Sequence, residues 1–489
     1  MQPARFRIFH GAPRSYRAGL LFTLVSLALL ATWVGAAERQ GASAPETNLI
    51  TIVTDDQGRW AVGAYGNDEV RTPHIDRLAR EGALFTRAFV ASPVCSPARA
   101  TWLTGRYPTE LGITDWISPD EAREGVGLRA RTWVQELQDA GYATGLFGKW
   151  HLGEADECHP TRLGFDTFVG FLAGGNRPMN PRLEVDGELR KLEGPLPDLL
   201  TDHAIAFVER NRGRAFHVAL HFRAPHLPYG PVPEADSKPF ADLEPTIPEF
   251  RGLDRAKVEN ATRKYYASIH SIDRNIGRLL DKLDEWKLSD RTLVLFTSDH
   301  GYNEGRHGIN TKGNGHWIVG GRSGPKRPNM WDTSIAVPLV VRWPGKAAAG
   351  ERVDGLISNI DMYRTLCGAL GIALDAASQE TVHGIDGCSL LFSSEEAKPI
   401  DRSALFGQYD LHNNGLAYMR MIRTERYKLV RHFHTRGMDE LYDLESDPEE
   451  TKNLYRRMRR ESPEQLAELE RRLEDWMRSI GDPLLEDDY

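Results

Sequence analysis

The stretch Cys95-Ser96-Pro97-Ala98-Arg99 reads C-x-P-x-R and is followed by the helix-compatible run Ala100 to Thr104 and by Gly105. Ser96 is expected to cap a helix here, with Pro97 at its first position and Gly105 at its end. The Cys95 side chain and Arg99 would then lie near the positive end of a helix dipole, where an anion is favoured. A lone cysteine is most often a small buried apolar residue, so the residues that the fold brings next to Cys95 decide its role.

Outside this stretch, short apolar segments rich in strand-forming residues alternate with segments of helical periodicity. This alternation predicts an α/β fold with a large, mixed and mostly parallel sheet flanked by helices. The expected strands are residues 48–54, 142–148, 216–222, 293–298 and 337–343, and the expected helices are residues 73–82, 133–141 and 265–283.

Side chains typical of metal and anion sites follow directly after four of these strands. They are Asp55-Asp56, Lys149 with His151, His226, and Asp299-His300. In open α/β sheets ligands bind at the carboxyl ends of the strands, so we expect these residues to meet. The three carboxylates suit a hard cation such as Ca²⁺ or Mg²⁺, whereas the histidine leaves the identity of the metal open. Taken alone, Asp55-Asp56 fits an ordinary turn at a strand end as well as it fits a metal site. Asp299-His300 also fits a turn, Lys149 a solvated turn lysine and His151 a core histidine.

Several segments, in the same order, resemble the type I sulfatases of the alkaline-phosphatase-like superfamily. The C-x-P-x-R at Cys95 resembles their first signature, and Gly148-Lys149-Trp150-His151-Leu152-Gly153 is similar to their second. Similar segments continue to Glu440-Leu441-Tyr442-Asp443-Leu444 and Asp447-Pro448 near the C-terminus. The resemblance therefore runs from about residue 47 to about residue 456.

The resemblance implies a modified residue and a metal. A formylglycine-generating enzyme would convert Cys95 to formylglycine, whose hydrated aldehyde is the nucleophile, and Arg99 would hold this side chain and the active-site anions. The implied metal ligands are Asp55, Asp56, Asp299, His300 and the modified Cys95, with Ca²⁺ as the expected ion and Mg²⁺ as the alternative.

The resemblance also implies how the remaining residues act on a sulfate group. Lys149 and Lys312 would bind sulfate oxygens, and Lys326 is an alternative to Lys312. His151 would contact the formylglycine. His226 would act as a general acid that protonates the leaving alcohol.

The sequence pattern changes from about residue 400. Four short strands at residues 405–409, 417–423, 427–432 and 440–444, followed by an amphipathic helix from Ser462, predict a smaller C-terminal α+β subdomain with an antiparallel sheet. We therefore divide the chain into a catalytic domain over residues 47–395 and a C-terminal subdomain over residues 400–489.

The N-terminus is typical of an export signal. Basic residues, among them Arg5 and Arg17, precede the apolar run from Leu20 to Val34, and Gly35-Ala36-Ala37 offers small residues for cleavage. We expect residues 1–37 to be removed and the protein to be periplasmic or secreted, with a retained anchor as the alternative. The apolar run is shorter than the ~20 residues that a membrane span needs, so no stable span is expected.

Composition and charge narrow the choice of partners. The chain has 61 Lys and Arg against 69 Asp and Glu, a net charge of −8, which argues against nucleic acid as the main partner. Four cysteines do not make a disulfide scaffold. If Cys95 is modified, Cys367 with Cys388 is the one pairing that we consider among the rest.

The resemblance implies a sulfuric ester hydrolase of arylsulfatase type that acts on a small-molecule or glycan sulfate ester. The predicted export favours a sulfated carbohydrate as the substrate. Two alternatives stay open: a phosphate or phosphonate ester hydrolase of the same superfamily, and a non-catalytic protein that binds sulfated glycans with a relic site. Polar loops with side chains that could contact a substrate contain Asn176, Arg177, His412 and Asn413, whereas His217 and His221 lie within a predicted strand and are expected to be structural.

Overall fold

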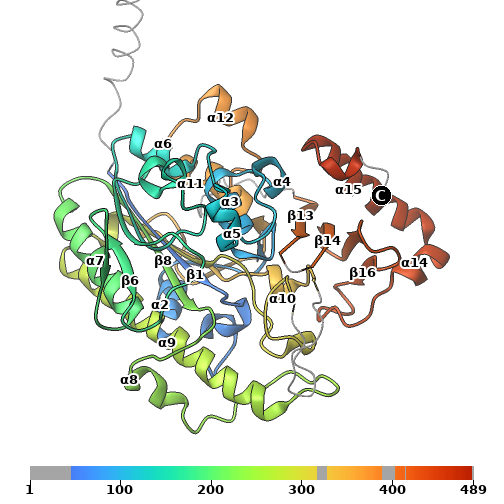
Figure 1. Ribbon diagram of the computed structural model, residues 1–489, viewed down its shortest axis with the longest axis horizontal. Coiled ribbons are helices and arrows are strands. Elements are labelled where there is room, and N and C mark those ends of the chain that lie inside the picture. The colour runs from blue at the N-terminus through green and yellow to red at the C-terminus, as the bar shows by residue number, and fades with distance from the viewer. Residues whose placement is uncertain (1–45, 316–327, 388–401, 414, 487–489) are drawn as a thin grey trace, which may run out of the picture. The chain divides into compact units, whose positions relative to one another are not determined.

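The computed structural model describes residues 46–315, 328–387, 402–413 and 415–486 (Figure 1). The predicted export signal, Lys326 and the predicted domain boundary between residues 395 and 400 lie outside these ranges. Within them, the structure contains no helix with the length and apolar character needed to cross a membrane.

A mixed sheet forms the centre of the larger part of the fold. In the described part of the chain it has ten strands, in the spatial order β11 (Glu351–Val353), β2 (Ala83–Phe85), β10 (Leu339–Arg342), β9 (Thr292–Ser298), β1 (Asn48–Asp55), β8 (Phe216–Pro225), β4 (Ala143–Lys149), β5 (Thr167–Phe171), β6 (Arg182–Val185) and β7 (Glu188–Lys191). The five strands from β9 to β5 are parallel, whereas β10 and β6 run antiparallel to their neighbours. The predicted mixed and mostly parallel sheet is confirmed.

Helices cover both faces of this sheet, because its central strands are apolar on both sides. Ile50 and Ile52 of β1 share a core cluster with α2 (Pro73–Glu81), α7 (Leu196–Asn211) and α9 (Arg255–Glu285). Leu49 and Val53 of the same strand share another with α3 (Cys95–Thr104), α6 (Trp133–Asp139) and α11 (Met362–Ala369). Successive side chains of a strand point to opposite faces, and Figure 1 shows one helical layer on each side.

Short elements complete the connections between these layers. They are α4 (Pro108–Leu111), α5 (Pro119–Arg123), α8 (Glu234–Ser237), α10 (Asp332–Ile335), α12 (Ala376–Thr381) and the paired strands β3 (Ala88–Phe89) and β12 (Ile357–Ser358). The long helix α9 begins earlier than predicted, after Asp254, whose side chain caps it by accepting from the Lys257 N–H. Its first turns are mostly polar, so apolar periodicity does not reveal them.

The C-terminal part has the predicted α+β arrangement. The antiparallel sheet consists, in order, of β13 (Ala404–Leu411), β14 (Ala417–Thr424), β15 (Tyr427–His432) and β16 (Glu440–Asp443). After α14 (Tyr455–Glu461), α15 (Pro463–Ser479) packs Leu469 and Trp476 into one core cluster with Ile422 and Leu429 of the sheet. Ser462 stands at the N-cap of α15 as predicted, although its side chain makes no capping hydrogen bond.

The cysteines in the described residues are free. Cys95, Cys158 and Cys367 are all buried thiols. Cys388, the partner considered for Cys367, lies outside the described residues.

Candidate active site

Cys95 is the first residue of α3 and lies at its N-terminal end, as the sequence predicts. The capping residue was predicted wrongly, because Val94 and not Ser96 occupies the N-cap position. Ser96 lies inside the first turn, where its hydroxyl oxygen accepts a hydrogen bond from the Ile117 N–H at 2.9 Å. Gly105 ends the helix with a φ of 61°, a left-handed conformation that favours glycine.

Asp55 and Asp56 bring two buried carboxylates to the carboxyl end of β1. Asp56 has a φ of 69°, which is uncommon for a residue other than glycine. Tyr265 of α9 fixes this turn, because its hydroxyl donates to the Asp56 carbonyl at 2.6 Å and accepts from the Gly58 N–H at 3.1 Å. The sequence does not reveal this role, since Tyr265 begins an apolar stripe that predicts only a core residue.

Four ligand atoms converge above the central strands. Asp55, Asp56, Cys95 and His300 are buried, and each offers one ligand atom within 4.8 Å of the others. The Cys95 Sγ lies 3.5 Å from Asp55 Oδ1 and 3.3 Å from His300 Nε2. Two carboxylates with an imidazole suit a divalent cation, so these residues fit the predicted metal.

Asp299, a further predicted ligand, lies beside this group and pairs with Arg99. Its Oδ2 accepts from Arg99 Nε at 3.0 Å, and its Oδ1 lies 3.5 Å from His300 Nε2. Burial raises the pKa of Asp299 to about 6, although His300 and Arg99 oppose that change. Arg99 Nη1 donates to the Lys149 carbonyl at 3.3 Å. Its buried Nη2 has no hydrogen-bond partner in the described part of the chain and is a donor available to an anion.

Lys149 and Lys312 bring two ammonium groups to the same carboxylates. Lys149 Nζ lies 2.7 Å from Asp55 Oδ2, while Lys312 Nζ lies 2.6 Å from Asp56 Oδ1 and 3.1 Å from Cys95 Sγ. Burial acts to raise the pKa of Asp55, but Lys149 and other nearby cations hold it well below its usual value. Burial also acts to raise the pKa of the Cys95 thiol, yet the two lysines lower it to about 6. The site is therefore built to hold negative charge at position 95.

His226 lies at the rim of this site, with its side chain 29% exposed. Its Nε2 lies 3.7 Å from Asp56 Oδ2, and its Nδ1 lies 2.7 Å from the Leu227 carbonyl. A ring nitrogen that faces a carbonyl oxygen must carry its proton to form a hydrogen bond. Nε2 is therefore the nitrogen of His226 that can exchange a proton with a ligand.

His151 is buried and has the complementary arrangement. Its Nε2 lies 3.1 Å from the Ile117 carbonyl, and its buried Nδ1 has no hydrogen-bond partner among the described residues. Burial, with Lys149 nearby, holds the pKa of His151 well below its usual value, so the ring is neutral at pH 7. Since Nε2 must donate to the carbonyl, Nδ1 carries a free lone pair.

The other polar residues that the sequence suggested do not join this cluster. His217 and His221 are buried in β8, as expected of structural residues, and His217 Nε2 lies 3.1 Å from Thr51 Oγ1. The loop residues lie elsewhere. Asn176 donates to the Arg182 carbonyl and Arg177 lines a separate cavity, while His412 and Asn413 contact Glu121.

Comparison with known protein families settles the relationship of the chain. The model of the sulfatase family matches residues 47–372, which is more than half of the chain. The chain belongs to the sulfatase family. A second family model, N-sulphoglucosamine sulphohydrolase, C-terminal, matches residues 325–479 of this sulfatase. The predicted family is confirmed, and with it the reaction class, the hydrolysis of a sulfate ester.

Individual relatives cover most of the chain. The N-acetylglucosamine-6-O-sulfatase of Bacteroides thetaiotaomicron is 26% identical over 530 residues, covering 90% of this chain and 88% of the relative. The steryl-sulfatase of Mus musculus is 31% identical over 448 residues, covering 72% of this chain and 67% of the relative.

Solved structures share the fold. A protein in complex with its substrate D-glucosamine-2-N,6-O-disulfate superposes with a TM-score of 0.77 at 24% identity, covering 90% of this chain and all of the other. The phosphonate monoester hydrolase of Agrobacterium radiobacter superposes with a TM-score of 0.67 at 23% identity, covering 87% of this chain and 96% of the other. At these identities the likeness concerns the fold alone, which both kinds of enzyme use.

Proposed function

We propose that this sulfatase removes sulfate from a sulfated carbohydrate. The observation that carries the proposal is the position of Cys95, buried at the N-terminus of α3 between a carboxylate cluster and two lysines. A glucosamine derivative is named in a relative that covers 90% of this chain and in the family model for its C-terminal part. The steryl-sulfatase covers a smaller share of the chain, 72%, which favours a sugar over a sterol.

In this proposal Asp55, Asp56, Asp299, His300 and the residue at position 95 would hold a divalent cation, Ca²⁺ in the first place and Mg²⁺ as the alternative. When bound, the cation would place positive charge against the sulfate oxygens. Formylglycine, made from Cys95 by a formylglycine-generating enzyme, would supply the hydroxyl that attacks sulfur. The convergence of four buried ligand atoms within 4.8 Å supports this assignment.

Arg99, Lys149 and Lys312 bind the sulfate group. Their charges neutralise an anion that would otherwise repel a nucleophile, and they are in place before the reaction begins. All three are buried, so water and salt screen them weakly. Lys312 Nζ already lies 3.1 Å from Sγ of Cys95, and Arg99 keeps one buried donor without a partner in the described residues.

The two histidines move protons in opposite directions. His226, at the exposed rim, donates from Nε2 to the oxygen of the leaving alcohol, where a general acid relieves the developing charge. His151, neutral and buried, accepts a proton at Nδ1 from the nucleophilic side chain when sulfate is released. The hydrogen bonds to the Leu227 and Ile117 carbonyls set which nitrogen is available in each ring.

We expect the purified protein to hydrolyse p-nitrophenyl sulfate with a higher kcat/KM than p-nitrophenyl phosphate, because its relatives act on sulfate esters. Release of p-nitrophenol at equal protein concentration measures both reactions. A preference for the phosphate would instead support the phosphate or phosphonate ester hydrolase. An unmodified Cys95 by intact-mass analysis of protein from its native host, together with no sulfate release, would support the non-catalytic alternative.

We expect Ca²⁺ to raise the temperature of thermal unfolding. A ligand that binds only the folded state stabilises it by about 2.7 kcal/mol at a hundred times its Kd. Asp56→Asn keeps the size of the side chain but removes a ligand charge, so the shift should shrink. Scanning calorimetry of chelator-treated protein with and without CaCl₂ measures the shift in unfolding temperature. The same measurement with MgCl₂ shows which of the two ions stabilises the protein more.

The control for this experiment is Asp443→Asn, which removes a carboxylate of β16 that pairs with Arg426 at 3.0 Å. This variant should keep the full Ca²⁺ shift. An undiminished shift in Asp56→Asn would contradict the assignment of Asp56 to the metal.

We also propose that residues 1–37 direct export to the periplasm or the medium and are then removed, and that the catalytic domain spans residues 47–395 and the C-terminal subdomain residues 400–489. The basic and apolar composition of the N-terminus supports export. N-terminal sequencing of protein recovered from the periplasm or medium tests it, since a mature chain that begins near residue 38 is expected.

A further inference from the structure

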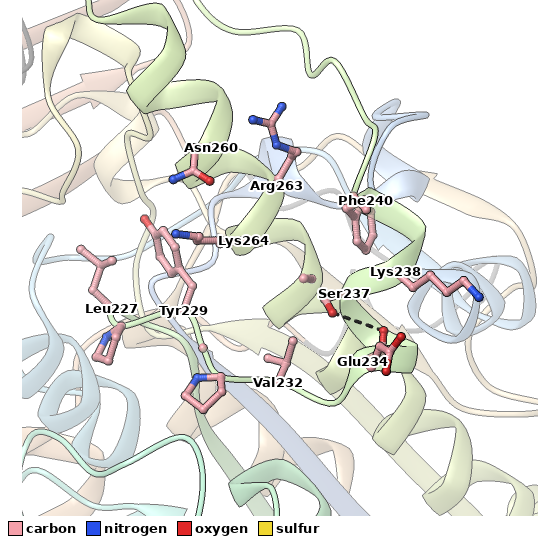
Figure 2. A pocket seen from close by; sticks show the side chains of 15 residues that line it. Leu227, Tyr229, Val232, Glu234, Ser237, Lys238, Phe240, Asn260, Arg263 and Lys264 are labelled. Carbon is pink, nitrogen blue, oxygen red and sulfur yellow. Dashed lines mark hydrogen bonds between the residues drawn. The ribbon is translucent and has the colours of Figure 1, made fainter.

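A cavity of about 860 Å³ lies between the loop of residues 227–241 and the N-terminal half of α9, and Leu227 at its edge directly follows His226. Figure 2 shows Leu227, Tyr229, Asn260 and Lys264 at one end of this cavity and Glu234, Ser237 and Lys238 at the other. Its volume is within the range of ligand sites in proteins. We call it the loop–α9 pocket.

Both walls of the loop–α9 pocket are tied to the active site at the end where Lys264 lies. Leu227 directly follows His226, and Arg223 holds the loop by donating to the Pro228 carbonyl at 2.9 Å. On the helix, Lys264 is followed by Tyr265, whose hydroxyl lies 2.6 Å from the Asp56 carbonyl. Tyr229 on the loop wall contacts the Tyr302 hydroxyl at 3.0 Å, two residues after His300.

The chain connects one end of the pocket directly to His226, because Leu227 lines the pocket. His226, with a half-buried side chain, is the least buried of the proposed site residues in the described structure, and we assign it to the oxygen of the leaving alcohol. A group bonded to this oxygen extends from the rim past His226, and the next residue along the chain, Leu227, lines the pocket with 42% of its surface exposed.

The charges that line the pocket favour an anion. The lining residues include three cations, Arg263, Lys264 and Lys238, and one carboxylate, Glu234. Arg263 is already engaged, because its Nη1 donates to the Leu243 carbonyl at 2.9 Å. Lys264 is exposed and has no ion-pair or hydrogen-bond partner within the described ranges. One turn before it, the exposed amide of Asn260 offers both a donor and an acceptor, which suit hydroxyl groups.

We propose that the loop–α9 pocket binds the alcohol part of a glycan that carries a second anionic group, a carboxylate or another sulfate, and that Lys264 pairs with that group. The proposal rests on the proposed function, since it takes the substrate to be a sulfate ester of a sugar. It makes this sulfatase selective for polyanionic carbohydrate over singly charged sulfate esters. Lys264 would then determine specificity without taking part in the chemistry.

The test compares Lys264→Ala with Lys282→Ala, which removes the same charge from an exposed, Glu285-paired position of α9 outside the pocket. The substrates are N-acetylglucosamine 6-sulfate, glucosamine 2-N,6-O-disulfate and a sulfated disaccharide with a uronic acid. For the disulfate and for the disaccharide, kcat/KM is divided by kcat/KM for N-acetylglucosamine 6-sulfate. Each of these two ratios should fall roughly fivefold in Lys264→Ala, the scale of one exposed ion pair. The fall should shrink with added salt. A fall with the disulfate identifies a second sulfate as the group that pairs with Lys264, and a fall with the disaccharide identifies a carboxylate.

Binding to catalytically disabled protein separates this proposal from the proposed function. In Cys95→Ala protein, calorimetry should show weaker binding of the polyanionic sugars when Lys264→Ala is added and unchanged binding when Lys282→Ala is added. The pocket assignment is overturned if neither the kcat/KM ratio nor the binding constant changes in Lys264→Ala. It is also overturned if both change equally in Lys282→Ala. If the wild type releases sulfate from none of the sugars, the proposed function fails, and the binding result alone decides on the pocket.

Discussion

Cys95→Ala is expected to abolish sulfate release. Loss of a nucleophile that acts together with its neighbours lowers kcat on the order of 10⁶-fold in a well-studied hydrolase, and here no other group of the cluster can replace it. Alanine fits the site, because Cys95 is 2% exposed and the change removes only the sulfur atom. The variant should therefore unfold at a temperature close to that of the wild type. Ion chromatography of released sulfate, with p-nitrophenyl sulfate as the substrate, measures the loss.

Cys367→Ala is the matched control for this variant. Cys367 is also a buried free thiol, but it lies in α11 and packs in the core. Its replacement removes the same sulfur atom from a buried site, so the unfolding temperature should change as little as in Cys95→Ala, while kcat stays at the wild-type value. Sulfate release that persists in Cys95→Ala, or that is lost equally in both variants, would contradict a nucleophile derived from Cys95.

The sequence reveals the positions of the site residues better than the contacts among them. Asp55, Lys149 and Asp299 each mark the place where a continuous apolar strand ends, and that signal is local. In a parallel sheet the ends of neighbouring strands meet at one edge, so the fold class alone predicts that these residues converge.

The ion pairs of the site depend on contacts that no local pattern encodes. Lys149 pairs with Asp55 across 94 residues of sequence, and Lys312 pairs with Asp56 across 256. Which lysine meets which carboxylate follows from strand order and loop length. Tyr265 shows the same limit, since the tertiary fold turns a residue with the pattern of a core position into a brace for Asp56.

Errors in the predicted elements have local physical causes. Ser96 is a good N-cap residue by type, yet its hydroxyl accepts from the distant Ile117 N–H, and the helix begins at Cys95, two residues before the predicted first position at Pro97. The hairpin of β6 and β7 was not predicted, because β7 is exposed at every position and has no apolar alternation. For Ser96 a contact outside the segment outweighs the local preference, whereas β7 has no local signal to read.

Lys149→Met is expected to lower kcat/KM for a sulfate ester by about 10² to 10³, the scale observed when one preorganised electrostatic group is lost. Methionine keeps much of the length and volume of the side chain but removes the charge that lies 2.7 Å from Asp55. The change also leaves Asp55 buried without that partner, and breaking one side of a buried ion pair costs about 3–5 kcal/mol. Activity and stability should therefore both fall, and the two effects must be measured separately.

Lys428→Met separates the two effects. Lys428 is as buried as Lys149, with a side chain 0% exposed, and its Nζ lies 2.8 Å from Asp332 and 2.6 Å from Glu450. It belongs to β15 and contacts none of the proposed catalytic side chains in the described structure, so its replacement should lower the free energy of unfolding without lowering kcat/KM of the folded protein. Urea unfolding and initial rates on the same preparations measure both quantities. An equal loss of kcat/KM in the two variants would show that Lys149 stabilises the fold and does not bind the sulfate group.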